Sequence, residues 1–279
     1  MSSAGGLQVM LRDAAQQLKD AGIPGAMRDA RLLLAHALKI PNDRLSIEMD
    51  QEASPQLQAE FSALVGRRRQ HQPMAQILRQ REFYGRNFRV TSDVLDPRPD
   101  TELIIDSAME HPFSTVLDLG TGTGCILLSL LCERPGSTGT GTDISPKALN
   151  VAGSNAEALH VTNRVHLIQS DWFANVSGMF DLIVSNPPYV SAKHYAQLED
   201  DVRKWEPEFA ITPGGDGLAP YRVISQGAAK MLTPGGRLIV EIGYDQGIAV
   251  QEMFTKSGFT DVSVRKDLNG KDRVVLGRI

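Results

Sequence analysis

The stretch TVLDLGTGTGCILLSLLCE, residues 115–133, decides the fold of this chain. It opens with a short apolar run that fits a buried strand, Thr115–Leu119, and closes with a helical pattern, Cys125–Glu133. Glycines at 120, 122 and 124 lie between the two, and glycine permits a tight turn and lets the backbone approach a ligand without a Cβ in the way. A strand that runs through such a loop into a helix predicts the first unit of an α/β sheet.

The same alternation of short apolar runs and helical patterns continues to the end of the chain. The predicted strands are 115–119, 165–169, 181–185 and 237–242, with 138–142 added by position and 261–265 and 273–277 forming the tail. The predicted helices are 125–133, 146–159, 221–232 and 246–257. Regular alternation predicts a mostly parallel, seven-stranded sheet covered by helices on both faces.

The first 75 residues have a different texture. Leu7, Leu11, Ala14 and Leu18 recur at helical spacing, as do apolar residues over 30–38 and 57–65, so we expect a small helical bundle. Runs at 75–81 and 87–91 flank a turn at Tyr84-Gly85, which predicts a hairpin. The expected domains are therefore a helical recognition domain (1–75), a hairpin linker (76–99) and a main domain (100–279).

Composition excludes several classes of protein. The 279 residues are 42% hydrophobic and 22% charged, which is ordinary globular usage rather than that of a disordered chain. Two cysteines allow neither a disulfide framework nor a four-cysteine zinc site, and no secretory signal is visible, so we expect a cytoplasmic protein without a metal. Residues 91–279 carry 16 Lys/Arg against 24 Asp/Glu, whereas positive charge concentrates over 67–89, which we interpret as a solvated face or a contact for an acidic protein or RNA.

Groups suited to a nucleoside follow three successive predicted strands. The loop spacing is G-x-G-x-G and no G-K-[ST] follows, which differs from dinucleotide and phosphate loops. Asp143 ends the second strand, where a carboxylate can bind both hydroxyls of a ribose or, alternatively, cap the next helix. Asp171 and Trp172 follow the third strand, where they suit an adenine amine and ring, although an aromatic there also serves as core. Together they indicate a nucleoside ligand without phosphate, such as S-adenosylmethionine.

The most specific feature is Asn186-Pro187-Pro188-Tyr189, directly after the fourth strand. An amide nitrogen is a poor nucleophile because its lone pair is delocalised into the carbonyl, so a site that methylates it must hold both hydrogens. The Asn186 side-chain oxygen and the Pro187 carbonyl can accept them, and the prolines stiffen these acceptors. Tyr189 can cover one face of the planar group. The alternative is a loop with a strand-end Asn and a double proline.

The C-terminal part is similar to class I methyltransferases of the N-P-P-Y type, which act on planar nitrogens of glutamine, adenine or guanine. More narrowly, the whole chain resembles the protein-(glutamine-N5) methyltransferases of the HemK/PrmC family, which modify peptide chain release factors. The motifs that carry this resemblance are Arg81-Glu82-Phe83-Tyr84-Gly85, Pro97-Arg98-Pro99-Asp100-Thr101-Glu102, Glu206-Pro207, Gly214-Gly215-Asp216-Gly217-Leu218, Glu241-Ile242-Gly243 and Asp272-Arg273-Val274. They run over residues 73–279, and the helical N-terminus fits the family's layout.

The resemblance implies a class I (Rossmann-like) methyltransferase that uses S-adenosyl-L-methionine and releases S-adenosyl-L-homocysteine. The cofactor residues that it implies are Gly120, Thr121, Gly122, Thr123 and Gly124 at the methionine part, Asp143 at the ribose, Asp171 and Trp172 at the adenine, and Asn186. The substrate glutamine would be bound by Asn186, Pro187, Pro188 and Tyr189, of which Asn186, Pro187 and Tyr189 would be catalytic. The implied target is the glutamine of the Gly-Gly-Gln loop in class 1 release factors.

Three alternatives remain open: a ribosomal-protein glutamine as substrate, an exocyclic amine of DNA or RNA, and a non-catalytic adaptor. The acidic run Glu199-Asp200-Asp201 disfavours nucleic acid, so we expect a protein substrate and no stable nucleic-acid partner. We also expect a monomer without membrane contact. Two features depart from the family pattern, Asp96 before P-R-P and the glycine-rich strand at 138–142. We expect both to lie outside the site.

Overall fold

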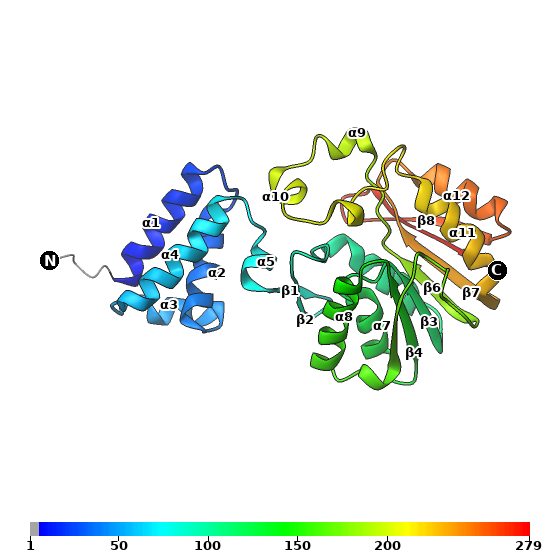
Figure 1. The fold of residues 1–279 in the computed structure, drawn as a ribbon, viewed down its shortest axis with the longest axis horizontal. Helices are drawn as coiled ribbons and strands as arrows, with labels where there is room; N and C mark the ends of the chain where they lie inside the picture. Colours follow the sequence, from blue (N-terminus) through cyan, green and yellow to red (C-terminus); the bar gives the residue numbers. More distant parts are fainter. Residues whose placement is uncertain (1–5) are drawn as a thin grey trace. The chain divides into compact units, whose positions relative to one another are not determined.

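The computed structural model describes residues 6–279, which form two compact units. One unit comprises the chain up to Arg79 together with Asp200–Trp205, and the other comprises Gln80–Glu199 and Glu206–Ile279 (Figure 1). The division into domains at 1–75, 76–99 and 100–279 stays a prediction. None of the helices in residues 6–279 combines the length and apolarity that crossing a bilayer needs.

The first unit is helical, as its apolar spacing predicts. Its helices are α1 (Leu7–Asp20), α2 (Ala26–Leu38), η1 (Asn42–Arg44), α3 (Leu45–Glu48), α4 (Pro55–Arg69), α5 (Met74–Leu78) and α10 (Asp200–Arg203). The predicted stripe on α1 is buried at Leu7, Leu11, Ala14 and Leu18. Helix α4 begins where the Ser-Pro signal places it, because the Ser54 hydroxyl accepts a hydrogen bond from the backbone N–H of Leu57 at 3.2 Å.

A buried ion-pair cluster holds this unit together. The guanidinium of Arg68 lies 2.9 Å from a carboxylate oxygen of Asp29 and 2.6 Å from one of Asp201, and both Arg68 and Asp29 are buried. His71 Nδ1 contacts the other oxygen of Asp201 at 2.8 Å. The interpretation of the whole 67–89 segment as a solvated face is therefore wrong for Arg68, because burial of Asp29 requires a cation beside it. Arg69 is exposed.

The second unit begins with the hairpin of β1 (Gln80–Phe83) and β2 (Arg86–Arg89), which turns at Tyr84-Gly85 as predicted. The prediction that its first arm starts at residue 75 is wrong, because α5 occupies Met74–Leu78. The carbonyl of Pro73 accepts from the N–H groups of Gln76 and Ile77 and so starts a helical turn.

Seven strands form the main sheet and confirm the predicted mostly parallel arrangement. They are β3 (Thr115–Leu119), β4 (Thr138–Asp143), β5 (Val165–Gln169), β6 (Phe180–Ser185), β7 (Leu232–Glu241), β8 (Thr260–Lys266) and β9 (Asp272–Arg278). Their order is β5-β4-β3-β6-β7-β9-β8, and β9 runs antiparallel to both neighbours. The strand order reverses between β3 and β6, which creates the crevice at their carboxyl ends where α/β folds bind ligands.

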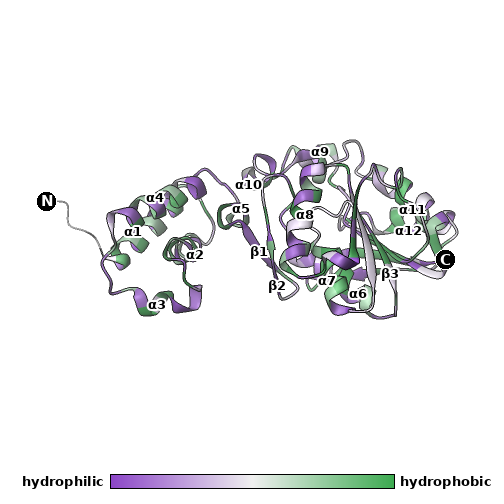
Figure 2. Cartoon of the chain, turned by 60° about the horizontal axis from the view of Figure 1, so that its bottom comes forward, coloured by the Kyte–Doolittle hydropathy of each residue, from purple (hydrophilic) through white to green (hydrophobic). Residues whose placement is uncertain are grey.

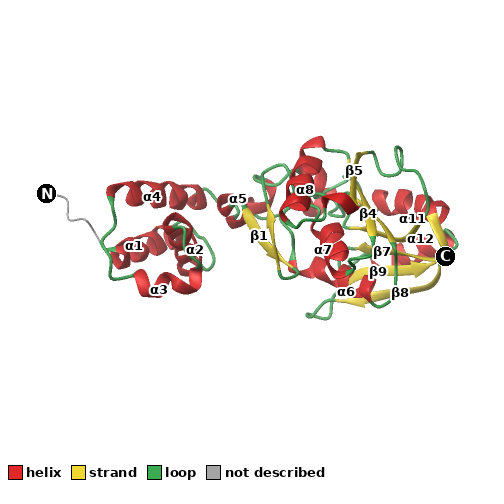
Figure 3. Cartoon of the chain, turned by 90° about the horizontal axis from the view of Figure 1, so that it is seen from below, coloured by secondary structure: helices red, strands yellow, loops and turns green. Residues whose placement is uncertain are grey.

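Helices cover both faces of the sheet (Figure 3). The helical segments of this unit are η2 (Pro99–Thr101), α6 (Glu102–Met109), α7 (Cys125–Glu133), α8 (Pro146–Ala158), η3 (Thr162–Arg164), α9 (Ala192–Tyr195), η4 (Glu208–Ala210), α11 (Ala219–Met231) and α12 (Gly247–Lys256). One core joins α6 and α7 to side chains such as Val116 and Leu182, and a second joins α11 and α12 to Leu117 and Ile183. Adjacent strand residues thus serve opposite cores, and Figure 2 shows hydrophobic residues running through the sheet.

The glycines of β4 have a packing reason. A Cβ on Gly139 would lie 2.5 Å from Leu127 Cδ1, and one on Gly141 would lie 3.0 Å from Leu127 Cδ2. Helix α7 therefore lies so close to β4 that only glycine fits beneath Leu127. The strand predicted by position at 138–142 is confirmed, and its unusual composition follows from this close approach.

Candidate active site

The glycine loop between β3 and α7 adopts a conformation that glycine favours. Gly120 and Gly122 have φ angles of 70° and 55°, and a Cβ on either would meet no atom within 4 Å, so both face open space. Gly124 differs, because its added Cβ would lie 3.0 Å from Leu128 Cδ1. Its φ of 79° and its tight surroundings give it a packing role at the start of α7.

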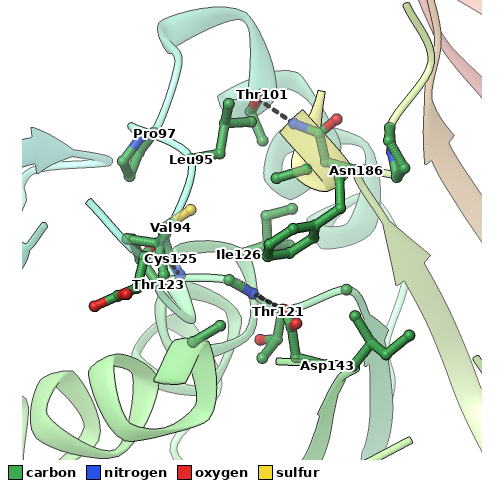
Figure 4. A pocket seen from close by; sticks show the side chains of 18 of the residues that line it. Val94, Leu95, Pro97, Thr101, Thr121, Thr123, Cys125, Ile126, Asp143 and Asn186 are labelled. Carbon is green, nitrogen blue, oxygen red and sulfur yellow. Dashed lines mark hydrogen bonds between the residues drawn. The ribbon is translucent and has the colours of Figure 1, made fainter. Parts of the chain in front are cut away.

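A cavity of about 240 Å³ opens at the carboxyl ends of β3, β4, β5 and β6 (Figure 4). The predicted site residues that line it are Gly120, Thr121, Gly122, Thr123, Asp143, Asp171, Trp172, Asn186 and Pro188. The structure thus brings the three predicted nucleoside groups and the first residue of the N-P-P-Y motif to one cavity. Gly124, Pro187 and Tyr189 are not among the lining residues.

Asp143 is held in place by the loop that it faces. One carboxylate oxygen accepts from the N–H of Gly122 at 3.0 Å, and the other accepts from the N–H of Ser145 at 2.9 Å. The helix cap of α8 is made instead by the Ser145 hydroxyl, which accepts from the N–H of Ala148. Burial raises the pKa of Asp143, while the backbone hydrogen bonds oppose that rise. Each oxygen keeps a lone pair for a further donor.

Asp118, at the end of β3, is the most deeply buried carboxylate near the loop, with 0% exposure. One of its oxygens accepts from the Thr121 hydroxyl at 2.7 Å, while its Oδ1 is buried and has no hydrogen-bond partner among residues 6–279. Burial raises the pKa of Asp118 to about 7. The sequence assigned it no role beyond opening the loop, since burial does not show in a D-L-G pattern.

Trp172 has a positive φ of 49°, packs against the second core and also lines the cavity, so it serves as core while its use toward an adenine ring stays a prediction. Its backbone carbonyl accepts from the Ser170 hydroxyl at 2.9 Å. That bond fixes the turn after β5, which places Asp171 and Trp172 at the edge of the cavity.

The N-P-P-Y segment is fixed at both ends. The Asn186 side-chain Nδ2 donates to the Thr101 hydroxyl oxygen at 3.1 Å (Figure 4). The Tyr189 hydroxyl donates to Glu241 at 3.2 Å, and the Tyr189 carbonyl accepts from Gln246 at 3.0 Å. Burial raises the pKa of the Tyr189 phenol well above its ordinary value, so this hydroxyl keeps its hydrogen. The segment is therefore held rigidly beside the cavity.

Sequence reasoning missed several residues of the site. Asp96 is 2% exposed, pairs with Arg81 and lines the cavity, so the expectation that it lies outside the site is wrong. Arg98 also lines the cavity and donates to Glu206 at 2.7 Å. An acid before P-R-P is accommodated because these arginines neutralise it. The P-R-P-D-T-E motif could have pointed to these residues, but in the sequence it only supports the family resemblance.

Comparison with known proteins agrees with this geometry. A family model described as the PrmC N-terminal domain matches residues 10–78, and one described as the methyltransferase small domain matches residues 92–202. The release factor glutamine methyltransferase of Cereibacter sphaeroides is 52% identical over 96% of this chain and 97% of that protein. The chain belongs to the release factor glutamine methyltransferase family.

Other members of the release factor glutamine methyltransferase family are also similar over most of their length. The one from Caulobacter vibrioides is 41% identical over 95% of this chain and 93% of that protein. A bifunctional methyltransferase of Rickettsia felis is 36% identical over 97% of this chain but only 57% of that protein. Among solved structures, a methyltransferase from Pyrococcus furiosus has a TM-score of 0.54 at 18% identity, covering 70% of this chain and 90% of that one, which supports the fold.

As a member of this family the chain is a methyltransferase with a class I, Rossmann-like fold. No group of three or more His, Cys, Asp or Glu in residues 6–279 is arranged to hold a metal ion. The roles of the individual cavity residues remain predictions, as do those of Gly124, Pro187 and Tyr189, which do not line the cavity.

Proposed function

We propose that this enzyme methylates the side-chain amide nitrogen of the glutamine in the Gly-Gly-Gln loop of class 1 release factors, with S-adenosyl-L-methionine as methyl donor. The observation that carries the proposal is one cavity lined by both the glycine loop with Asp143 and the amide of Asn186. The names of the relatives support the release factor as acceptor.

The residues present fit S-adenosylmethionine. Gly120 and Gly122 present backbone with open space where a Cβ would stand, as close approach of a methionine chain requires. Asp143 offers a free lone pair on each oxygen to a ribose diol, and Trp172 offers a ring face to adenine. When bound, S-adenosylmethionine supplies a methyl group on a positively charged sulfur, and S-adenosylhomocysteine is the product that remains.

The chain's own contribution is to orient the acceptor amide. Asn186 offers a side-chain oxygen, and the Pro187 carbonyl offers a second acceptor, so two hydrogens of the glutamine NH2 are held. Proline after Asn186 restricts the backbone, and Tyr189 is held by its hydrogen bond to Glu241. Both acceptors are therefore already in place before the substrate binds, so little free energy is spent on moving them. Positioning of reactants can contribute about 7–11 kcal/mol to a bimolecular reaction. No side chain need remove a proton before transfer, because the methylated amide loses its extra proton readily.

A methyl-transfer assay with radiolabelled S-adenosylmethionine tests the acceptor. We expect label on a class 1 release factor and none on its Gly-Gly-Gln glutamine-to-alanine variant. Label on ribosomal protein alone, or on DNA or RNA alone, would show that the acceptor is wrong while the methyltransferase site is right. We also propose that the enzyme acts in the cytoplasm, where release factors act on ribosomes, and that it is a monomer.

A variant pair tests the amide clamp. Asn186→Ala should lower kcat at least about 100-fold while the Kd for S-adenosylhomocysteine changes by less than about threefold. Asn150→Ala, at an exposed position of α8, is the matched control and should leave kcat unchanged. Near-normal turnover by Asn186→Ala would show that Asn186 does not hold the substrate.

A further inference from the structure

Glu241, the last residue of β7, is a buried carboxylate that touches two parts of the site. It is 1% exposed. Its Oε2 accepts from the Thr101 hydroxyl at 2.6 Å, and its Oε1 accepts from the Tyr189 hydroxyl at 3.2 Å. One carboxylate thus connects the turn η2 to the N-P-P-Y segment. Glu241 itself is not among the residues that line the cavity.

The Thr101 hydroxyl has a single hydrogen, which decides the direction of the next hydrogen bond. An ionised carboxylate can only accept, so that hydrogen belongs to Glu241. The Thr101 oxygen is then left as an acceptor toward its other neighbour, Asn186, at 3.1 Å. An acceptor can bind the NH2 end of the Asn186 amide but not its oxygen end.

The consequence reaches the substrate. The two ends of an asparagine amide have almost the same shape, so packing alone does not distinguish them and hydrogen bonding must. With Nδ2 turned to Thr101, Oδ1 lies on the other side of the Asn186 amide, and no hydrogen bond among residues 6–279 ends on it. We propose that Glu241 is a positioning residue that, through Thr101, selects which end of the Asn186 amide faces the glutamine NH2. This inference rests on the function proposed above.

The charge of Glu241 is influenced by groups from every element packed against it, of which Arg273 favours the charge and Asp100 opposes it. They are Asp100 and Thr101 of η2, Tyr189 after β6, Arg273 of β9, and Tyr221 of α11, whose hydroxyl donates to the Glu241 backbone carbonyl at 2.9 Å. Burial raises the pKa of Glu241 to about 7, against the opposing effects of the Thr101 hydrogen bond, Arg273 and Tyr189. A protonated Glu241 can donate to Thr101, which frees the Thr101 hydrogen for Asn186 Oδ1 and leaves the amide free to turn over.

Substitutions at Thr101 separate the hydrogen-bond role from packing. Thr101→Val keeps the shape and removes the hydroxyl, so kcat should fall about 10- to 100-fold with little change in the Kd for S-adenosylhomocysteine. Thr101→Ser restores the hydroxyl and should recover kcat to within about threefold of the wild type. Thr138→Val, at the exposed first residue of β4, is the control for a Thr-to-Val change outside the site and should leave kcat unchanged. Equal losses in Thr101→Ser and Thr101→Val would overturn the inference.

The pH profile gives a readout that a purely structural role would not move. In the wild type, kcat should fall about tenfold per pH unit below the pKa of Glu241, near pH 7. Glu241→Gln cannot ionise, so its kcat should be low and nearly flat between pH 6 and 8. A wild-type slope that persists unchanged in Glu241→Gln would overturn the inference.

Nuclear magnetic resonance of the Asn186 side-chain amide tests the positioning role of Glu241 without any methyl-accepting substrate. We expect its two N–H signals to titrate near pH 7 in the wild type and to lose that titration in Glu241→Gln and in Thr101→Val. If this titration is seen without methyl transfer to a release factor, the proposed function fails, and the positioning of Asn186 by Glu241 through Thr101 stands. If methyl transfer is seen but the signals do not change on substitution of Glu241 or Thr101, the positioning role of Glu241 fails and the proposed function stands.

Discussion

Replacing Asp143 by alanine tests the cofactor side of the site. Its two carboxylate oxygens accept from the N–H groups of Gly122 and Ser145 at 3.0 and 2.9 Å, and each oxygen keeps one lone pair toward a ribose. A hydrogen bond to a charged group contributes about 1.5–3 kcal/mol, so two of them contribute about 3–6 kcal/mol. Because about 1.4 kcal/mol is tenfold, Asp143→Ala should weaken binding of S-adenosylhomocysteine by about 10²- to 10⁴-fold.

Titration calorimetry with S-adenosylhomocysteine and its 2′,3′-dideoxy analogue isolates the ribose contacts. The wild type should prefer the natural ligand by about the same factor, and Asp143→Ala should bind the two ligands almost equally. Burial raises the pKa of Asp143, so wild-type affinity for the natural ligand should decline as the pH falls through that raised value, where the carboxylate is protonated.

Asp181, at the start of β6, provides a matched control. Its carboxylate also accepts from two backbone N–H groups, those of Ser114 and Thr115, at 2.8 and 3.0 Å, but it lies at the amino ends of the strands. Asp181→Ala should lower the free energy of unfolding and leave ligand affinity unchanged. If Asp143→Ala bound S-adenosylhomocysteine within threefold of the wild type, or still distinguished the two ligands, Asp143 would not bind the ribose.

Three further predictions concern stability, measured by urea unfolding. Gly139→Ala should lower the free energy of unfolding by about 1–3 kcal/mol, because the new Cβ would lie 2.5 Å from Leu127 Cδ1. Gly136→Ala is the control and should leave it unchanged, because a Cβ there has no neighbour within 4 Å. Equal effects of the two substitutions would contradict close packing at Gly139. Arg68→Ala should cost about 1–3 kcal/mol because it leaves Oδ2 of the buried Asp29 carboxylate without a hydrogen-bond donor, while the exposed Arg28 still lies 3.0 Å from Oδ1. Exposed Arg69→Ala should change stability by under about 0.5 kcal/mol, and an equally small effect of Arg68→Ala would refute the stabilising role of the cluster. Without ligand, the free energy of unfolding should decline as the pH rises from 6 to 8, by about 1 kcal/mol for each buried carboxyl whose pKa is raised to about 7. The reason is that the folded state releases protons in this range, whereas the unfolded chain has already lost them at lower pH. A free energy of unfolding that did not change with pH would contradict the raised pKa values. These carboxyls are Asp118, Glu206 and Glu241.

Local patterns predicted most of the second unit. The strand β3, the glycine loop and α7 follow from short-range apolar spacing and turn chemistry, and their bounds agree with the prediction. The helix over Met74–Leu78, where the sequence predicted the hairpin arm 75–81, could not be predicted in the same way, since a short segment of mostly apolar residues suits a strand or a helix equally. Only the backbone contacts of Pro73 decide it.

The sequence by itself determined the fold class, the cavity's position and its main polar groups. Strand ends carry their own side chains, and parallel strands bring those ends to one edge, so Asp143, Trp172 and Asn186 could be placed together from the chain alone. Tertiary structure alone decided how these groups are oriented. Thr101 lies 85 residues from Asn186 and 140 from Glu241 along the chain. No local pattern encodes such distances, because hydrogen-bond direction and burial arise only when distant elements pack.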